Sequence, residues 1–520
     1  MSAARFILVV LTAVTMMLVR QTSCYKYHYH AAKLRDFTAK ADKILAAPPP
    51  PPAVRPPPRV GGVFYPIGYG ADPTGHNDSA DAIQSALNDA FEQLSDPSQE
   101  LMPGIKDLGG AVIDLQGGKY KIGKPISFPP VGGGDILIKE GSLRAAEGFP
   151  SDRFLVELLF PQSEILINKT ENVSLLQGTT IFYEDITFRD LLFDSGHSGG
   201  GLLVVDTARV RILNSYFFNF TTQGILVQGG HETFIQTCFV GQHPTVGRDK
   251  NERYYSGTGI DLASNDNVIT DTVVFSAQVG LLVRGQANVI TGLHTYNNNN
   301  NNNKSWHSAA AAGVLLKSDA SYNRITASFF DGNNNQVVVE DPYFVYITGN
   351  FFFGHANVVL KPAKRDGGAI ALVVVDNYFV GFAGEPMVEL QGEFTTVHDV
   401  VVDQNQGKYL TVQSTAAKVA VAGRGTKWVA DFSKKLVFPN KIDHFQYSFL
   451  VKQPPAEGWG GPRFPIHAAT NVSGNVVVVE SEGVVDAVVS VVVDQFNPIG
   501  EGTFAFDGNG EGYKVLRKVV

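Results

Sequence analysis

One repeated unit constrains the fold of this chain more than any other feature: a glycine, an aliphatic residue, a variable residue and a second aliphatic residue. The steps between successive copies are 35, 21, 33, 23, 21 and 30 residues. Clear copies begin at Gly224, Gly259, Gly280 and Gly313. Degenerate copies, in which another residue replaces the glycine, begin at Gln336, Asn357 and Met387. The shortest steps are 21 residues and others are longer. This pattern predicts a solenoid in which some coils are minimal and others carry inserted loops.

Each repeat predicts a β-strand, because the aliphatic runs are too short for helices, are rich in Val and Ile, and are bounded by turn-forming residues. A second apolar pair follows each unit, and Asn267, Asn288 and Asn323 precede this pair in successive repeats. We expect these Asn side chains to stack at a bend and to hydrogen-bond from coil to coil. The predicted fold is all-β, a right-handed parallel β-helix.

The composition fits one large β-rich core with a smaller appendage. The chain has 520 residues, 44% of them apolar, and 53 are glycine, which suits strands joined by many tight turns. The net charge of -8 and the isoelectric point near 5.9 argue against nucleic acid as a partner, because phosphate-binding surfaces are rich in Lys and Arg.

The N-terminus has the pattern of a secretory signal. Arg5 precedes an uncharged apolar stretch, and small residues follow up to Cys24, so residues 1–24 are predicted to be a signal peptide. The apolar stretch is short for a membrane anchor, which is the rival interpretation, and no membrane attachment is expected after cleavage. Six N-x-Ser/Thr sequons agree with a secreted glycoprotein; they begin at Asn77, Asn168, Asn172, Asn219, Asn303 and Asn471.

The remaining chain divides into three predicted segments. Residues 25–59 are a basic and Pro-rich linker, residues 60–408 are the β-helix with an N-terminal cap, and residues 409–520 form a small C-terminal β-rich domain. The strands expected in the last domain are Val419–Val421, Trp428–Phe432, Val476–Val479 and Val484–Val493. Loops are expected to be inserted at Gly241–Gly257 and Tyr296–Ala312.

The cap is predicted from an amphipathic pattern that begins near Asn77. Its apolar residues recur at a spacing of three and four, from Ile83 to Leu94, with Asn77 or Asp78 placed to cap the first amides. Such a helix would cover the open first coil. Only Cys24 and Cys238 are present, so no disulfide framework is predicted, and Cys238 is expected to be a buried apolar filler.

Several separated motifs resemble a known family. Tyr69–Gly75 and the following Asp78–Gln84 resemble the opening of pectin-lyase-like β-helix proteins. Asp107–Ala111, Gly229–Thr233 and Gly241–His243, together with Asn265-Asp266-Asn267, are similar to plant polygalacturonases of the Quartet type. The resemblance implies secretion to the cell wall and hydrolysis of the α-1,4 bonds of de-esterified pectin.

The chain departs from the pattern of conventional polygalacturonases at their catalytic motifs. Ser256-Gly257-Thr258 stands where an Asn-Thr-Asp is usual, and Ala277-Gln278-Val279 where an Asp pair is usual. Gly230-His231-Glu232 follows its strand, so it does not correspond to the usual Gly-His-Gly. The carboxylates that perform the reaction in this chain must therefore be sought elsewhere.

Alternation along the strand at Gly259 makes Asp261 the predicted general acid. Its neighbours Ile260 and Leu262 are expected to point inward, so Asp261 points outward between Leu226 and Leu282 of adjacent coils. A carboxylate in an apolar column is open to a raised pKa. Glycoside hydrolysis needs a second carboxylate, and an inverting pair lies about 6.5 to 9.5 Å apart. The candidates for the partner are Asp266, Glu232 and, with less support, Asp194.

Basic residues near this position are predicted to bind an acidic polymer. Arg284, Lys317 and Lys361 lie in one outward column, with Glu340 among them. Like charges on adjacent coils are unfavourable unless an anion, a carboxylate such as Glu340, or water offsets them, and a galacturonate carboxylate would do so. Further candidates for substrate binding are His231 beside Glu232, and His243, Arg248 and Arg253 in the first inserted loop.

The leading hypothesis is a secreted, monomeric cell-wall hydrolase of homogalacturonan that needs no cofactor and no metal ion. A pectin-binding wall protein that has lost activity is the second hypothesis. A pectate lyase is the third, and it would need a Ca²⁺ site of clustered carboxylates, which no single column of Asp residues supports.

Overall fold

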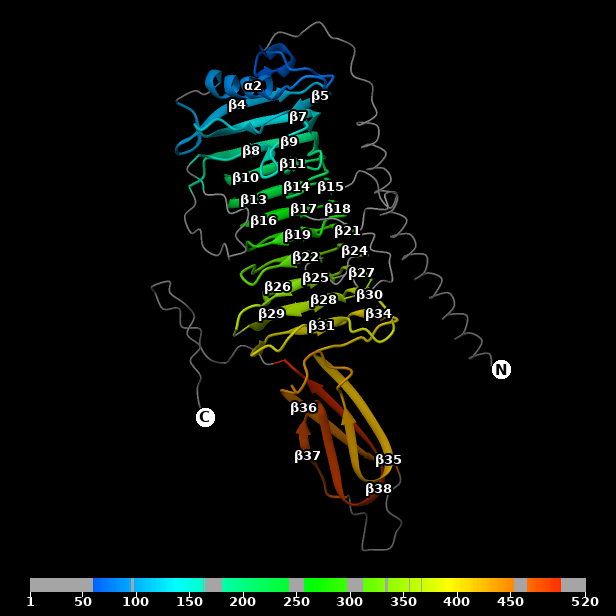
Figure 1. The fold of residues 1–520 in the computed structure, drawn as a ribbon. Coiled ribbons are helices and arrows are strands. Elements are labelled where there is room, and N and C mark those ends of the chain that lie inside the picture. The colour runs from blue at the N-terminus through cyan, green and yellow to red at the C-terminus, as the bar shows by residue number, and fades with distance from the viewer. Residues whose placement is uncertain are drawn as a thin grey trace, which may run out of the picture.

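A computed structural model of the chain describes residues 59–94, 98–161, 163, 180–242, 257–296, 312–332, 335–354, 356–365, 367–452 and 465–496. Its main body is a parallel β-helix, as predicted, in which each strand from β10 to β29 pairs with the strand three places later in the chain (Figure 1). Each coil therefore contributes one strand to each of three sheets. None of the helices in these ranges is long and apolar enough to cross a membrane.

Sheet 1 contains the strands of the glycine repeat. Its members are β8 (Phe154–Leu158), β10 (Gly200–Ala208), β13 (Gln223–His231), β16 (Thr258–Asn265), β19 (Val279–Val283), β22 (Ala312–Leu316), β25 (Asn335–Glu340), β28 (Ala356–Lys361) and β31 (Val388–Leu390). The pairing is in register, so that Ile225, Ile260 and Leu281 form one column of the core.

Sheet 2 follows sheet 1 around each coil. Its members are β11 (Arg211–Leu213), β14 (Phe234–Gln236), β17 (Val268–Thr270), β20 (Val289–Thr291), β23 (Arg324–Thr326), β26 (Tyr343–Thr348), β29 (Gly368–Val375), β32 (Thr396–His398) and β33 (Val401–Asp403).

Sheet 3 closes the triangle. Its members are β5 (Lys119–Ile122), β12 (Tyr216–Phe218), β15 (Phe239–Gly241), β18 (Val273–Phe275), β21 (His294–Tyr296), β24 (Phe329–Asp331), β27 (Phe351–Phe353), β30 (Tyr378–Val380) and β34 (Gln406–Lys408). In the first coils, β7 (Gly133–Ala145) and β9 (Tyr183–Asp194) are long strands that bend around the corner between sheets 2 and 3.

The repeated glycines are required at the corner where the chain enters sheet 1. A Cβ atom at Gly224, Gly259 or Gly280 would lie 2.5 to 2.7 Å from the carbonyl oxygen of the equivalent residue in the next coil. This distance is far below van der Waals contact, so close stacking of the coils excludes a side chain at these three positions. The equivalent positions of later coils are Gln336, Asn357 and Met387, so the exclusion applies to the coils that carry the glycines. Steric exclusion at this corner therefore explains the period that is visible in the sequence.

The predicted Asn ladder is present at the corner between sheets 1 and 2. Asn267 donates from Nδ2 to Oδ1 of Asn288 at 2.8 Å, and Asn288 donates in the same way to Asn323 at 2.9 Å. All three are buried. A second ladder, which we did not predict, joins Asn350 to Asn377 at the corner between sheets 2 and 3. Cys238 is fully buried, as expected, and burial raises the pKa of its thiol to about 12.

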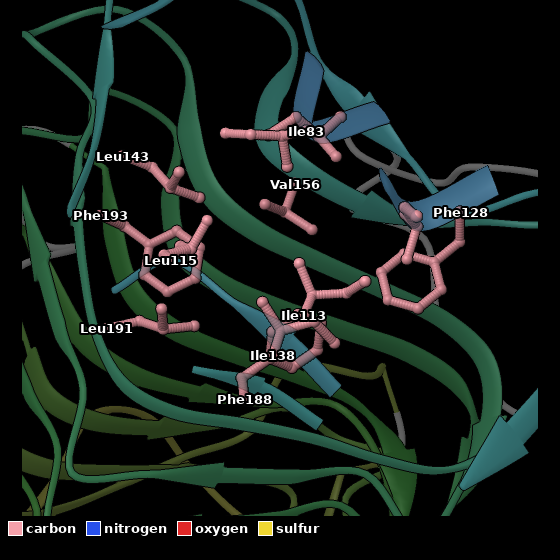
Figure 2. A pocket seen from close by; sticks show the side chains of 12 residues that line it. Ile83, Ile113, Leu115, Phe128, Ile138, Leu143, Val156, Phe188, Leu191 and Phe193 are labelled. Carbon is pink, nitrogen blue, oxygen red and sulfur yellow. The ribbon is translucent and has the colours of Figure 1, made fainter. Parts of the chain in front are cut away.

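The helix α2 (Ala80–Gln93) covers the first coil. Ser79 is the N-cap residue and its side chain forms no capping hydrogen bond, but the predicted Asp78 accepts a hydrogen bond from the first helical amide, that of Ala80, at 3.0 Å. Ile83 and Leu87 of α2 pack over the side chains of the first coils, as Figure 2 shows for Ile83. The cavity left between them is only about 20 Å³, so this end of the core is tightly filled.

A four-stranded antiparallel sheet lies beyond the last coil (Figure 1). It consists of β35 (Ala416–Asp431), β36 (His444–Val451), β37 (His467–Ser473) and β38 (Val476–Asp494). Phe438 leaves this domain and joins the core of the β-helix, where its ring meets that of Phe394 edge-on. The lower end of the solenoid is thereby closed as well.

The strands of this domain are longer than we predicted. Val419–Val421 and Trp428–Phe432 are largely parts of one strand, β35, and the two valine-rich runs that end the domain are both parts of β38. The glycines between the runs do not end the strands. They fall where the long strands bend and the register shifts, between Gly425 and Lys427.

Candidate functional site

Asp261 lies on the outer side of sheet 1, as predicted, but it is not accessible. Its side chain faces away from the core between Leu226 and Leu282, and the residue is 2% exposed. Arg284 of the next coil donates from Nε and Nη2 to the two carboxylate oxygens at 3.0 and 2.9 Å. Asp261 and Arg284 therefore form a buried, doubly hydrogen-bonded ion pair.

The electrostatic environment of Asp261 combines two opposing effects. Burial raises the pKa of its carboxyl above the ordinary value, in the direction that we predicted, while the charge and hydrogen bonds of Arg284 lower it. Gln223 adds a further hydrogen bond that favours the charged form. Since the charged form has these partners, transferring a proton to a substrate would require the ion pair to open.

The other basic residues of the predicted column are also neutralised within the chain. Lys317 and Lys361 contact the two oxygens of Glu340, with N–O distances of 2.6 and 3.7 Å. Glu340, whose carboxylate lies between the two lysines, is a buried residue. The charge of Arg284 and Lys317 on adjacent coils is thus offset by Asp261 and Glu340, which is one of the alternatives left open by the sequence.

Glu232 and Asp266 occupy equivalent positions of successive coils, at the corner between sheets 1 and 2. The backbones of both residues are left-handed, with φ of 60° and 56°, and that of Arg209 in the preceding coil is also left-handed, with φ of 54°. This conformation makes the tight bend of each coil. Asp266 is exposed there, and its amide donates to the carbonyl of Gln286 at 3.0 Å.

Four side chains gather at this corner, which we call the corner cluster: Glu184, Arg209, His231 and Glu232. Arg209 forms ion pairs with Glu184 through Nη2 and with Glu232 through Nη1, the latter at 3.6 Å. His231 Nδ1 lies 3.5 Å from the same Glu232 oxygen. Two carboxylates from different coils therefore meet at one guanidinium.

The two carboxylates of the corner cluster differ in exposure. The side chain of Glu184 is 3% exposed, whereas that of Glu232 is 41% exposed. The second oxygen of Glu184, Oε2, is buried and has no hydrogen-bond partner within the described residues. A buried carboxylate oxygen without a donor is energetically unfavourable unless a water molecule or a ligand completes the site.

The structure separates Asp261 from the predicted partners. β16 is extended from Asp261 to Asn265, so Asp266 follows at a Cα distance of roughly 13 Å or more at the usual rise per residue. Glu232 occupies the equivalent corner one coil earlier. Neither carboxylate forms a close pair with Asp261, whereas Glu232 and His231 do lie together. His243, Arg248 and Arg253 lie outside the described residues.

Glu184 and Arg209 were not identified from the sequence, although a signal for them exists. Both precede short apolar runs that align with the run after Glu232: Ile186-Thr187-Phe188 and Val210-Arg211-Ile212. Counting back from these runs places Glu184 in the coil column of His231, and Arg209 in that of Glu232. No group of three or more His, Cys, Asp or Glu side chains that fits a metal ion occurs in the described part of the chain.

Comparison with known proteins gives a clear similarity over most of the chain. The sequence is 42% identical over 438 residues to polygalacturonase QRT3 of Arabidopsis thaliana, covering 83% of this chain and 84% of that protein. No protein-family model matches the sequence.

Two solved tailspike structures align with the chain at low identity. The Dettilon tailspike protein is 12% identical, with a TM-score of 0.47, over 83% of this chain and 94% of the other. The tailspike of the E. coli bacteriophage HK620 in complex with a hexasaccharide is 11% identical, with a TM-score of 0.44, over 84% of this chain and 93% of the other.

Proposed function

Because the chain belongs to the family of the Arabidopsis polygalacturonase QRT3, we propose that it is a secreted hydrolase that cleaves the α-1,4 bonds of homogalacturonan in the plant cell wall. One structural observation supports the proposal most directly. Glu184 and Glu232 both contact Arg209, which brings together two carboxyl groups of the kind that glycoside hydrolysis needs as acid and base.

In this proposal Glu232 is the general acid and Glu184 the general base. The more exposed Glu232 donates a proton to the glycosidic oxygen as the bond to the anomeric carbon breaks. Water attacks that carbon from the opposite side, and Glu184, whose Oε2 has no partner within the described residues, takes a proton from the water. The proton given up by one carboxylate is thus matched by the proton gained by the other.

Arg209 and His231 have supporting roles in the proposed reaction. The guanidinium of Arg209 can bind the carboxylate of a galacturonate ring through two hydrogen bonds. Its contact with Glu232 is long, at 3.6 Å, so a bound substrate carboxylate would compete with Glu232 for the guanidinium. His231, beside Glu232, is within reach of the same ring.

A second function is supported by the burial of Asp261. If Asp261 and Arg284 serve only to hold adjacent coils together, and the usual catalytic motifs are absent, the chain would bind pectin without cleaving it. In that case Arg209 and His231 would bind the polymer, and the two glutamates would only stabilise the corner.

Assays of the secreted protein on de-esterified polygalacturonate distinguish these possibilities. We expect reducing ends to appear without the ultraviolet absorbance of unsaturated products. Glu232→Gln and Glu184→Gln should each lower kcat by about 10²-fold or more, whereas Glu389→Gln on the same solenoid should have no effect.

Asp261→Asn tests the assignment made from the sequence alone. Loss of turnover in Asp261→Asn, with full activity in Glu232→Gln, would show that Asp261 is the general acid. It would contradict the catalytic roles proposed for the corner cluster. Binding of polygalacturonate without reducing ends and without ultraviolet absorbance would establish the pectin-binding function instead. Circular dichroism of each variant shows whether the fold is kept.

A further inference from the structure

A groove on the outer side of sheet 3 lies away from both groups of residues described above. It has a volume of about 550 Å³ and is formed by the first coils, where β5, β7 and β9 run side by side. Its walls include the loop at Thr74 and Gly75 and the segment that ends at Glu147. The corner cluster lies between sheets 1 and 2, so the groove belongs to another side of the solenoid. Its volume is that of a typical small-ligand site.

Three cations line this groove, together with the carboxylates of Glu147 and Asp194. Lys119 and Lys121 come from β5, and Arg144 comes from the adjacent strand β7, directly paired with Lys121. Adjacent strands lie about 4.8 Å apart, so Lys121 and Arg144 bring like charges together. Such an arrangement is favourable when an anion lies between the charges.

Arg144 is fixed in the groove by a buried carboxylate. Its Nε contacts Asp194 at 3.3 Å, while 71% of its side chain is exposed, so the end of the guanidinium faces the groove. Asp194 in turn accepts hydrogen bonds from the amide of Gly196 at 3.0 Å and from Asn219 at 2.7 Å. Asp194, a minor catalytic candidate from the sequence, thus positions an arginine.

The remaining lining suits a sugar ring. Ser142 and Thr74 contribute hydroxyl groups, and the partly exposed Ala145 and Ala146 contribute apolar surface. The side chain of Tyr120 is buried in the core, where its hydroxyl donates to the carbonyl of Leu115 at 2.9 Å, so this ring takes no part in the groove surface. Cations, hydroxyls and apolar patches together match a ring that carries a carboxylate, hydroxyls and apolar C–H faces.

We propose that this groove is an accessory site that binds a uronate segment of a pectic chain, with Arg144 and Lys119 at the sugar carboxylates. The identity of the ligand rests on the proposed function, whereas the anionic character of the ligand rests on the groove itself. Two separate sites on one polymer raise the effective affinity for long chains above that for short ones.

The test is binding of trigalacturonate to the full-length secreted protein by isothermal titration calorimetry at low and high salt. Lys119→Gln and Arg144→Gln should each weaken the site in the groove about tenfold, and added salt should weaken it in the unmodified protein. The matched control is Lys124→Gln, an exposed lysine that pairs with Asp81 outside the groove. Lys119→Gln leaves the Arg144–Asp194 pair intact, which covers the case in which Arg144→Gln disturbs folding.

Three outcomes would overturn the proposal: unchanged trigalacturonate binding in Lys119→Gln and Arg144→Gln, an equal loss in Lys124→Gln, or equally tight binding of the methyl-esterified trisaccharide. The result is independent of catalysis. Loss of binding in the groove variants of a protein that releases no reducing ends would support the groove and reject the hydrolase. Release of reducing ends, together with unchanged trigalacturonate binding in the groove variants, would support the hydrolase and reject the groove.

Discussion

Asp331 lies on the outer side of sheet 3, between Tyr296 and Phe353 of neighbouring coils. Burial raises the pKa of its carboxyl from the ordinary 3.8 to about 6. The folded state therefore binds a proton more tightly than the unfolded state does between about pH 4 and pH 6. Because unfolding releases this proton, stability falls as the pH rises through that window and stays lower above it.

Replacing Asp331 by Asn should remove this dependence. At pH 7.5 we expect Asp331→Asn to raise the free energy of unfolding by on the order of 2–3 kcal/mol, because the buried charge is absent. At pH 4 the effect should be small, since the wild-type carboxyl is then protonated in the folded state. Urea denaturation at both pH values measures the difference, and exposed Asp376→Asn is the control. Equal effects at the two pH values would contradict the argument.

At the scale of the secondary-structure element, backbone stacking and side-chain ladders define each coil. The glycine column fixes the corner that leads into sheet 1, and Asn ladders satisfy buried polar groups at the other two corners. A buried amide without its partner is costly, so an uninterrupted ladder holds its neighbours in register.

Gly259→Ala tests the steric origin of the repeat. A Cβ atom there would lie 2.6 Å from the carbonyl oxygen of Gly280 and 2.5 Å from Val274, so the coils would have to separate. We expect a loss of roughly 1–3 kcal/mol in the free energy of unfolding. Gly423→Ala in β35, where a Cβ meets nothing within 4 Å, should change stability by less than about 1 kcal/mol. Equal effects of the two substitutions in thermal melts would reject steric exclusion.

Several features of these elements were predictable from the sequence because they repeat. The strands of sheet 1, the column of Arg284, Lys317, Glu340 and Lys361, and the first Asn ladder all follow from counting along the period. The second ladder was missed because earlier coils have Ser215, Cys238 and Thr272 at the equivalent position. Nothing in the period reveals that Arg284 reaches diagonally to Asp261, because that contact depends on side-chain conformation and burial.

The corner cluster was only half predicted for a related reason. Glu184 belongs to β9, a long strand that passes around more than one sheet and lacks the glycine unit, so its register can be read only from the apolar run that follows it and not from the glycine repeat. The length of β38 was hidden in the same way, because glycine in a bent strand resembles glycine in a turn. Irregular elements therefore carried the residues that sequence reasoning could not place.

At the scale of the whole molecule, the solenoid is closed at both ends. α2 covers the first coil, and Phe438 from the C-terminal domain belongs to the same core cluster as Val400 and Val402 of the last coil. The C-terminal sheet has its own apolar core around Trp428. Phe438 and the neighbouring Val437 therefore link the two cores.

Phe438→Ala should loosen the last coils more than the middle of the solenoid. A buried Phe replaced by Ala costs about 3–5 kcal/mol, and this loss should act locally because each coil contacts mainly its neighbours. Hydrogen exchange of the amides in β33 and β34 should accelerate while that in β13 and β16 does not. Exposed Phe496→Ala is the control. Uniform acceleration in all coils would show that the solenoid unfolds as one unit.

The direction of the hydrogen bonds between coils has a mechanical consequence. In every sheet these bonds run along the long axis of the molecule, since the strands stack in that direction (Figure 1). Tension applied along this axis would load one coil boundary at a time and peel the molecule apart stepwise, releasing 21 residues between Gly259 and Gly280, for example. Tension across the axis would load many boundaries at once. The protein is therefore expected to be mechanically anisotropic, weak when pulled end to end and strong when pulled from side to side.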